Sequence, residues 1–206
     1  ALAELTGARL HLAHLSTAGS VRMVREAKAR GIKVTAEACP HHFMLTEEAV
    51  CGYNTHAKMN PPLRTGADVQ AIKDGLRDGT IDVIATDHAP HATQEKQQEF
   101  AAAPNGIVGL ETAWPLTLTL VEEGVLSLEA AVAKLTTEPA KAFSLKKGTL
   151  APGADADVAI ADLHEGWEID PARFRSKSRN TPFAGWKVKG RITTTIMGGR
   201  IVHETT

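Results

Sequence analysis

The stretch Ile81-Asp-Val-Ile-Ala-Thr-Asp-His-Ala-Pro-His91 decides the fold. Its first half is apolar and has the length of a buried strand, Ile81–Thr86, and it ends at an acid and two histidines. Before it, the spacing of Val69, Ile72 and Leu76 predicts a helix over about residues 67–78 that ends at Gly79. The stretch therefore predicts a helix followed by a strand that carries polar side chains at its carboxyl end.

Two more predicted strands precede this unit. Residues 9–15 alternate between apolar and polar side chains, and residues 33–39 are typical of a second strand, which ends at Pro40. Between them Val21, Val24 and Ala27 recur at helical spacing, after caps at Ser16-Thr17 and before a stop at Gly31. The order strand–helix–strand–helix–strand, with apolar strands, predicts parallel α/β packing.

The second half of the chain changes character near residue 146. Two residues, Gly198-Gly199, separate β-rich runs, which predicts a hairpin with a tight primed turn. We therefore divide the chain into residues 1–145, a parallel α/β unit, and residues 146–206, a small β lobe. The remaining expectations are a loop-rich segment over 46–66, an exposed loop over 92–104, helices over 109–123 and 127–143, and strands over 157–161, 188–197 and 200–203.

Composition excludes several classes of protein. The net charge of −1 over 206 residues, without any block of basic residues, argues against nucleic-acid binding. Two cysteines are too few for a disulfide framework, which predicts a reducing compartment such as the cytoplasm. No apolar run approaches the roughly 18 residues of a membrane span. The chain begins at Ala1 without a methionine, and we expect it to be a piece of a longer protein.

Polar residues end two of the predicted strands. His14 follows the first strand and Asp87 the third, and the carboxyl ends of parallel strands are where barrel enzymes place their chemistry. Imidazole nitrogen and carboxylate oxygen suit a dication such as zinc. Taken singly, His14 is more typical of a core or surface residue, and Asp87 of a helix cap or loop. Two candidates also fall short of the three or four protein ligands that zinc takes.

Five motifs in register, and the entry to the lobe, carry a family resemblance. The chain resembles the second half of a class I dihydroorotase of the amidohydrolase superfamily over essentially its whole length. The motifs are His11-Leu-Ala-His-Leu-Ser-Thr17, Ala38-Cys-Pro-His-His42, Lys58-Met-Asn-Pro-Pro-Leu-Arg64, Thr86-Asp-His-Ala-Pro-His91, Gly106-Ile-Val-Gly-Leu-Glu-Thr112 and Gly148-Thr-Leu-Ala-Pro-Gly-Ala-Asp-Ala-Asp157.

The resemblance implies strands six to eight of a (β/α)8 barrel, with a small β-sandwich lobe beside it. It implies a paired zinc site in which His14 and Asp87 are ligands and Asp87 is also the catalytic acid and base. It places Asn60, His91, Asn105 and Gly106 at the substrate, although the family usually has Phe-Gly where this chain has Asn105-Gly106. The implied reaction is the reversible hydrolysis of dihydroorotate to carbamoyl-aspartate in pyrimidine synthesis.

The other metal ligands of the family would all precede residue 1, so we expect this chain alone to be inactive. Its expected partners are a missing N-terminal half or a second chain, with a homodimer or aspartate transcarbamoylase as further candidates. Three alternatives stay open: another cyclic-amide hydrolase such as an allantoinase, an inactive scaffold subunit of aspartate transcarbamoylase, and a plain α/β domain. We expect structural roles for four histidines. His11 should lie on the opposite side of its strand from His14, His88 should lie behind Asp87, and His41 and His42 should support the structure around the site. The thiols of Cys39 and Cys51 are expected to be inert.

Overall fold

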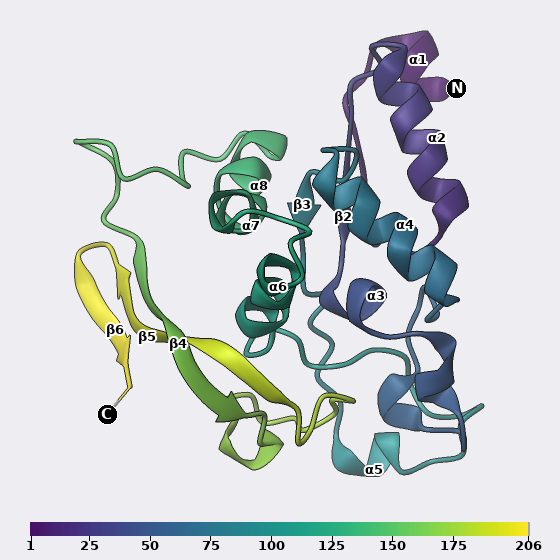
Figure 1. Cartoon of the computed structure of the whole chain (residues 1–206), viewed down its shortest axis with the longest axis vertical. Helices are drawn as coiled ribbons and strands as arrows, with labels where there is room; N and C mark the ends of the chain where they lie inside the picture. Colours follow the sequence, from purple (N-terminus) through teal and green to yellow (C-terminus); the bar gives the residue numbers. More distant parts are fainter. Residues whose placement is uncertain (206) are drawn as a thin grey trace.

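The computed structural model describes residues 1–205, and its first sheet is parallel. Three short strands, β1 (Leu10–Leu12), β2 (Val34–Ala38) and β3 (Val83–Ile84), are hydrogen-bonded in the order β1-β2-β3. Helices α2 (Ala18–Ala29) and α4 (Gly66–Arg77) lie side by side against this sheet (Figure 1). The predicted parallel α/β order is confirmed, while all three strands are shorter than the sequence predicted.

The core beneath α2 and α4 explains why these helices form. Val21 and Val24 of α2 and Ile72 and Leu76 of α4 are at most 2% exposed. Burying each such side chain stabilises the fold by about 1.5–3 kcal/mol. The two helices approach closely at Gly75, where a Cβ would lie 2.9 Å from Cγ1 of Val21. A side chain at this crossing would force the side chains of Val21 and Ile81 to shift.

The N-terminus of α4 is capped by side chains that also reach α2. The Thr65 side chain accepts the Asp68 backbone N–H, and the Asp68 carboxylate accepts the N–H of Thr65, which is a capping box. Such a cap contributes about 1 kcal/mol. Asp68 also accepts the backbone N–H of Ala18 at 2.8 Å, and this bond holds the pKa of the carboxyl below its usual value. The carboxylate of Asp68 therefore caps the start of α4 and also links α4 to the start of α2.

The helix expected over residues 127–143 is wrong as a single element. It is divided into α7 (Leu128–Leu135) and α8 (Thr137–Ala142) at Thr136, whose φ of −132° and ψ of −78° leave helical geometry. Helix α6 (Ala113–Glu122) precedes them, and α6–α8 lie beside β3 (Figure 1). The remaining short elements are α1 (Leu2–Thr6), α3 (Pro40–Met44), η1 (Glu47–Val50), η2 (Thr55–Ala57), α5 (Thr93–Lys96) and η3 (Pro171–Arg173).

The second sheet is antiparallel, with the order β4 (Val158–Glu168), β5 (Lys187–Met197) and β6 (Arg200–Glu204). The predicted hairpin is confirmed, because Gly198 and Gly199 join β5 to β6 with φ angles of 55° and 77°. Both angles lie in the left-handed region that a primed turn requires. Strand β4 continues well beyond the predicted residues 157–161.

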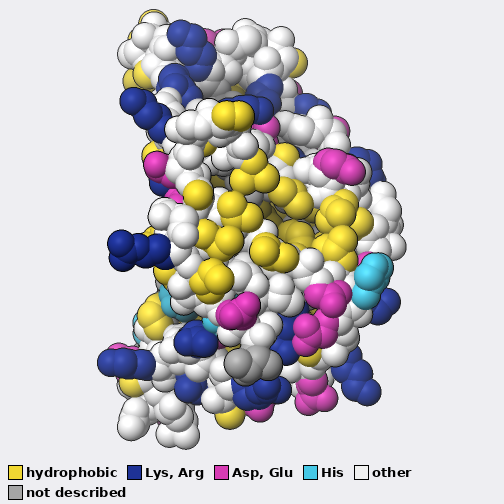
Figure 2. Space-filling model, turned by 90° about the vertical axis from the view of Figure 1, so that its left-hand side faces the viewer, with side chains coloured by type: hydrophobic (Ala, Val, Ile, Leu, Met, Phe, Trp, Pro, Cys, Tyr) yellow, Lys and Arg dark blue, Asp and Glu magenta, His cyan; other side chains and the backbone are white. Residues whose placement is uncertain are grey.

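The antiparallel sheet leaves apolar side chains exposed. Figure 2 shows hydrophobic side chains gathered in the middle of the face on the side where this sheet lies in Figure 1. The exposed large hydrophobic residues of β4–β6 are Ile160, Met197, Ile201 and Val202, which are 49–64% exposed. A contiguous patch of this kind marks a surface that contacts another element or chain.

Among residues 1–205, no helix has the length and apolar character needed to cross a membrane.

Candidate metal and substrate site

The structure brings His14 and Asp87 together at the carboxyl ends of β1 and β3. His14 Nε2 lies 3.8 Å from Asp87 Oδ1, and each side chain is 31% exposed. Both residues have a positive φ, 53° for His14 and 48° for Asp87. This backbone conformation costs about 1–2 kcal/mol for a residue with a side chain, and such strain concentrates at functional sites. It also takes the chain out of the extended conformation that the preceding strands have.

Glu37 of β2 lies between the two strands that carry these residues. Its Oε1 is 3.2 Å from His14 Nε2, and its Oε2 is 3.0 Å from Nε2 of His11. The expectation that His11 faces away from His14 is therefore wrong, since both imidazoles contact one carboxylate. Strand β1 ends at Leu12 and His14 takes a positive φ, so the two-residue alternation does not extend to His14. Glu37 itself was missed, although a carboxylate inside an apolar strand is a readable signal.

The spacing of His14 and Asp87 fits one metal ion. Imidazole nitrogen and carboxylate oxygen each bind zinc at about 2 Å, so two ligands of one ion lie no more than about 4 Å apart. The observed 3.8 Å satisfies that limit without movement of the backbone. Glu37 contacts the same Nε2 of His14, so a metal ion bound to this nitrogen would take the place of the Glu37 contact.

The residues expected at the substrate lie partly together. His91 Nε2 is 2.9 Å from the carbonyl oxygen of Asn105, so the structure joins His91 to the Asn105-Gly106 pair. Gly106 has a φ of 103°, and a Cβ there would lie 2.5 Å from the Cβ of Ala89. A glycine is therefore required at this position on two grounds, its backbone conformation and the close approach to Ala89.

Asn60 and His88 occupy separate positions. Asn60 is exposed, and within residues 1–205 its side chain makes no hydrogen bond to His14, Asp87 or His91. The next residue, Pro61, accepts a hydrogen bond from His42 Nε2 at 3.0 Å, which ties this loop to the end of β2. His88 Nδ1 accepts the backbone N–H of Gly109 at 3.1 Å, which fixes the neutral ring with its proton on Nε2.

Asn180 is a buried residue that the sequence analysis missed. It is 2% exposed, and its Nδ2 donates to the carbonyl oxygens of Ala89 at 2.9 Å and Gly106 at 3.2 Å. Its Oδ1 accepts the backbone N–H of His91 at 3.2 Å. One amide side chain thus fixes both segments of the predicted substrate site. Because Asn180 lies 89 residues beyond His91, no local pattern predicts this contact.

The end of β2 carries a second group of potential metal ligands. Cys39, His41 and His42 are at most 3% exposed, and one ligand atom from each lies within 4.8 Å of the others. His41 Nε2 and His42 Nδ1 have no hydrogen-bond partner among the described residues. Burial raises the pKa of the Cys39 thiol and lowers the pKa of both imidazoles. These shifts favour the neutral forms, which suits a buried core cluster.

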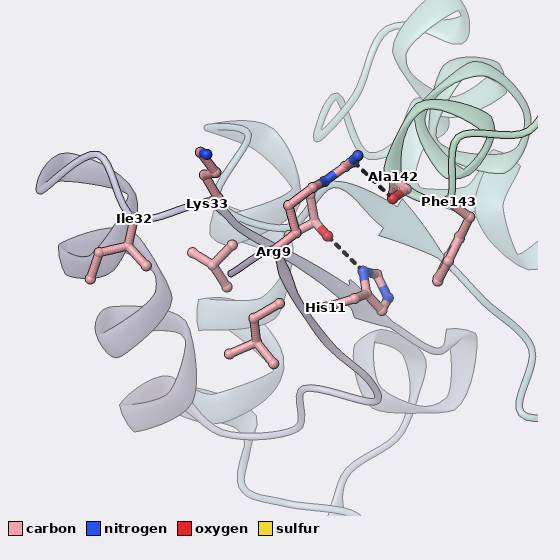
Figure 3. A pocket seen from close by; sticks show the side chains of 9 residues that line it. Arg9, His11, Ile32, Lys33, Ala142 and Phe143 are labelled. Carbon is pink, nitrogen blue, oxygen red and sulfur yellow. Dashed lines mark hydrogen bonds between the residues drawn. The ribbon is translucent and has the colours of Figure 1, made fainter. Parts of the chain in front are cut away.

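Two pockets lie away from His14 and Asp87. One, of about 360 Å³, opens at the free edge of β1 between Arg9, Lys33 and Phe143, and His11 reaches its wall (Figure 3). Its Arg9 guanidinium is already bonded to the carbonyl oxygen of Ala142 at 3.1 Å. The other, of about 750 Å³, lies between α6 and the antiparallel sheet, with Trp114, Trp167, Arg191 and His88 among its lining residues.

The fold and the site are those of an α/β protein with imidazole and carboxylate groups at the carboxyl ends of parallel strands. The model of the amidohydrolase family matches residues 2–202. The chain belongs to this family of hydrolases.

Curated relatives include a dihydroorotase of Syntrophotalea carbinolica, 62% identical over 203 residues, and one of Syntrophus aciditrophicus, 54% identical. The matches cover 98% of this chain, which spans about half (48%) of each relative. Among solved structures, an L-hydantoinase (dihydropyrimidinase) from Arthrobacter aurescens has a TM-score of 0.92 and 33% identity, with 98% of this chain and 46% of that chain covered. A dihydropyrimidinase from Brevibacillus agri has the same TM-score, 27% identity and the same coverage.

Proposed function

We propose that this chain is part of a dihydroorotase, which reversibly hydrolyses dihydroorotate to carbamoyl-aspartate. The observation that carries the proposal is the pair His14 and Asp87, two strained residues that meet at the carboxyl ends of β1 and β3 with a spacing that suits one ion. The identity of 54–62% to proteins named dihydroorotase supports this substrate. The hydantoinase neighbours support a cyclic amide as the wider substrate class.

The proposed architecture assigns β1, β2 and β3 to strands six, seven and eight of a (β/α)8 barrel over residues 1–145. Their parallel order supports this, as do the outer edges of β1 and β3, which have no strand partner in the described sheet. Residues 146–206 are proposed as one part of a β-sandwich lobe. The exposed apolar side chains of β4–β6 in Figure 2 support a second layer against this sheet.

In this proposal Asp87 moves the proton of the reaction. It receives a proton from the attacking water and delivers it to the amide nitrogen of the leaving group, a role for which a partly exposed carboxylate is suited. His91, Asn105 and Gly106, with Asn60 from the loop after η2, bind and orient the substrate. His14 and Asp87 would hold a paired zinc centre, which when bound lowers the pKa of water and polarises the amide carbonyl.

The remaining ligands are proposed to come from outside the described residues. His14 and Asp87 are two ligands, fewer than a paired site needs, and the chain spans about half of each curated relative. We propose that the other half of such a protein, or a second chain, completes the centre. A homodimer or an assembly with aspartate transcarbamoylase is a further proposal, and neither nucleic acid nor membrane is a proposed partner.

Turnover of three substrates tests the proposed activity. The protein that contains this chain together with its complement is assayed with dihydroorotate, allantoin and hydantoin. Hydrolysis of dihydroorotate at the highest kcat/KM is expected. A preference for allantoin or hydantoin contradicts the proposed substrate, although the protein would still be a cyclic-amide hydrolase. No turnover with intact metal content supports an inactive scaffold subunit.

The chain by itself provides a second test. Because it contributes two ligands, we expect no measurable turnover and weak zinc binding from the purified 206-residue chain. Zinc content after dialysis and turnover at saturating dihydroorotate measure both properties. Turnover with stoichiometric metal would show that these residues form a complete site.

A further inference from the structure

Two lysine side chains bind the segment 99–106 through its backbone. Lys58 Nζ donates to the carbonyl oxygens of Phe100, Ala101 and Ala103 at 2.6, 3.1 and 2.5 Å. Lys96 Nζ donates to the carbonyl oxygens of Pro104 and Gly106 at 2.8 and 3.1 Å. Five backbone carbonyls of this segment are thus bound by two ammonium groups, both from residues that precede it in the chain.

Neither ammonium group has a carboxylate partner among residues 1–205. Lys96 is only 2% exposed, and a buried charge is stable only where its donors are bonded. The backbone carbonyls of the segment supply those bonds in place of an acid. Moving the segment away would leave the ammonium of Lys96 without these partners, so the bonds of this buried group depend on the position of the segment.

The end of the bound segment is where the proposed substrate contacts lie. The Gly106 backbone N–H donates to the carbonyl oxygen of Lys58 at 2.8 Å, and the Asn105 carbonyl faces His91 Nε2. Lys58 therefore contacts the segment with both its backbone and its side chain. The ring of Phe100 lies 5.3 Å from the Lys58 ammonium, which adds a cation–π contact.

We propose that Lys58 and Lys96 are positioning residues that hold segment 99–106 in its observed position and thereby place Asn105 and Gly106 beside His91 for substrate binding. The substrate part of this proposal rests on the proposed function. We call the hydrogen bonds from Lys58 and Lys96 to this segment the clamp. The clamp rests on the five carbonyl contacts and the burial of Lys96.

Lys134 offers a matched control. It is also a buried lysine, 7% exposed, and its Nζ donates to a backbone carbonyl, that of Ile81, at 2.6 Å. It binds no part of segment 99–106. A Lys→Met substitution at 58, 96 or 134 keeps most of the aliphatic stem and removes only the ammonium group.

Hydrogen exchange tests the clamp in the 206-residue chain. We expect Lys58→Met and Lys96→Met to accelerate amide exchange in segment 99–106 by about tenfold to a hundredfold. This is the change in rate that corresponds to the free energy of hydrogen bonds lost to a charged group. Exchange in α4, measured in the same samples, reports whether each variant is folded. Lys134→Met should leave segment 99–106 at the wild-type rate, and Lys58→Arg should restore it. Wild-type exchange in both folded methionine variants would overturn the clamp.

Steady-state kinetics in the complete enzyme test the positioning role. Lys58→Met and Lys96→Met should raise KM for dihydroorotate by about tenfold, with a smaller change in kcat, unchanged zinc content and rescue by Lys58→Arg. Faster exchange with an unchanged KM would overturn the positioning role. If the wild-type enzyme does not hydrolyse dihydroorotate, the proposed function fails, and the exchange experiment still decides whether the clamp exists.

Discussion

The ends of β2 and β3 carry similar residues in different surroundings. After β2 come Cys39, His41 and His42, all at most 3% exposed, with two ring nitrogens that have no partner among residues 1–205. After β3 come Asp87, His88 and His91, in which Asp87 is 31% and His91 23% exposed. One end holds neutral groups inside the core, and the other holds polar groups that reach solvent.

The two strand ends therefore differ in the solvent access of their histidines rather than in residue type. Desolvation is the largest cause that lowers the pKa of His41 and His42, so both are neutral at pH 7 and cannot exchange protons readily with a substrate. The β3 end combines exposure with a strained backbone at Asp87 and a hydrogen bond from its segment to Asn180. The number of histidines in each of the two motifs does not distinguish the buried strand end from the partly exposed one.

The largest expected effect separates Asp87 from Cys39. Asp87→Asn in the complete enzyme should lower kcat by about 10²–10⁴-fold, because an amide cannot accept the proton of the attacking water. Cys39→Ala, at the corresponding end of β2, should retain most of the turnover in the folded fraction. Steady-state kinetics with metal analysis measure both variants. Near-normal activity of Asp87→Asn would make the proposed role wrong.

The next effect distinguishes His91 from His88 within the β3 end. His91→Ala should lower kcat/KM by about ten- to a hundredfold through weaker binding of the substrate, with zinc content unchanged. His88→Ala loses the bond from Gly109 N–H and should mainly lower stability. Kinetics and zinc analysis on both variants decide the matter. Metal loss in His91→Ala, or a selective rise of KM in His88→Ala, reverses the two assignments.

A smaller effect tests whether the β2 end is only a core cluster. His41→Leu removes a buried nitrogen that has no partner among the described residues, so the free energy of unfolding should stay the same or rise by about 1–3 kcal/mol. His42→Leu loses its bond to the Pro61 carbonyl and should lower that free energy by about 0.5–1.5 kcal/mol. Chemical denaturation measures both. A strong loss of stability and of bound metal in His41→Leu would show that these side chains hold an ion.

The smallest expected effect concerns pH. Burial, with a contribution from the Lys58 charge, lowers the pKa of Lys96 from 10.5 to about 8. Between these two values the unfolded chain binds a proton that the folded chain does not, so this group makes the free energy of unfolding rise with pH from 8 to 10.5. Denaturation of wild type and Lys96→Met at several pH values isolates the contribution of Lys96. Equal pH dependence in the two proteins would show that Lys96 titrates normally.

Local patterns predicted the features that depend on neighbouring residues. Gly198-Gly199 predicted the hairpin because a primed turn needs two residues with positive φ, and the spacing of Val21 and Val24 predicted the buried face of α2. Features that depend on distant contacts were missed. His11 and His14 share Glu37, and Asn180 joins two segments from far along the chain. Neither contact leaves a periodic signal in the sequence.

The contact between Gly106 and Ala89 constrains how the chain can diverge. A Cβ at position 106 would lie 2.5 Å from the Cβ of Ala89, and the φ of Gly106 is 103°, so a side chain at 106 is excluded on both grounds. Asn105, next to this contact, is exposed and free of that limit. Variation between related proteins should therefore be tolerated at 105 and suppressed at 106. Within the pair Asn105-Gly106, the side chain can therefore change at position 105 alone.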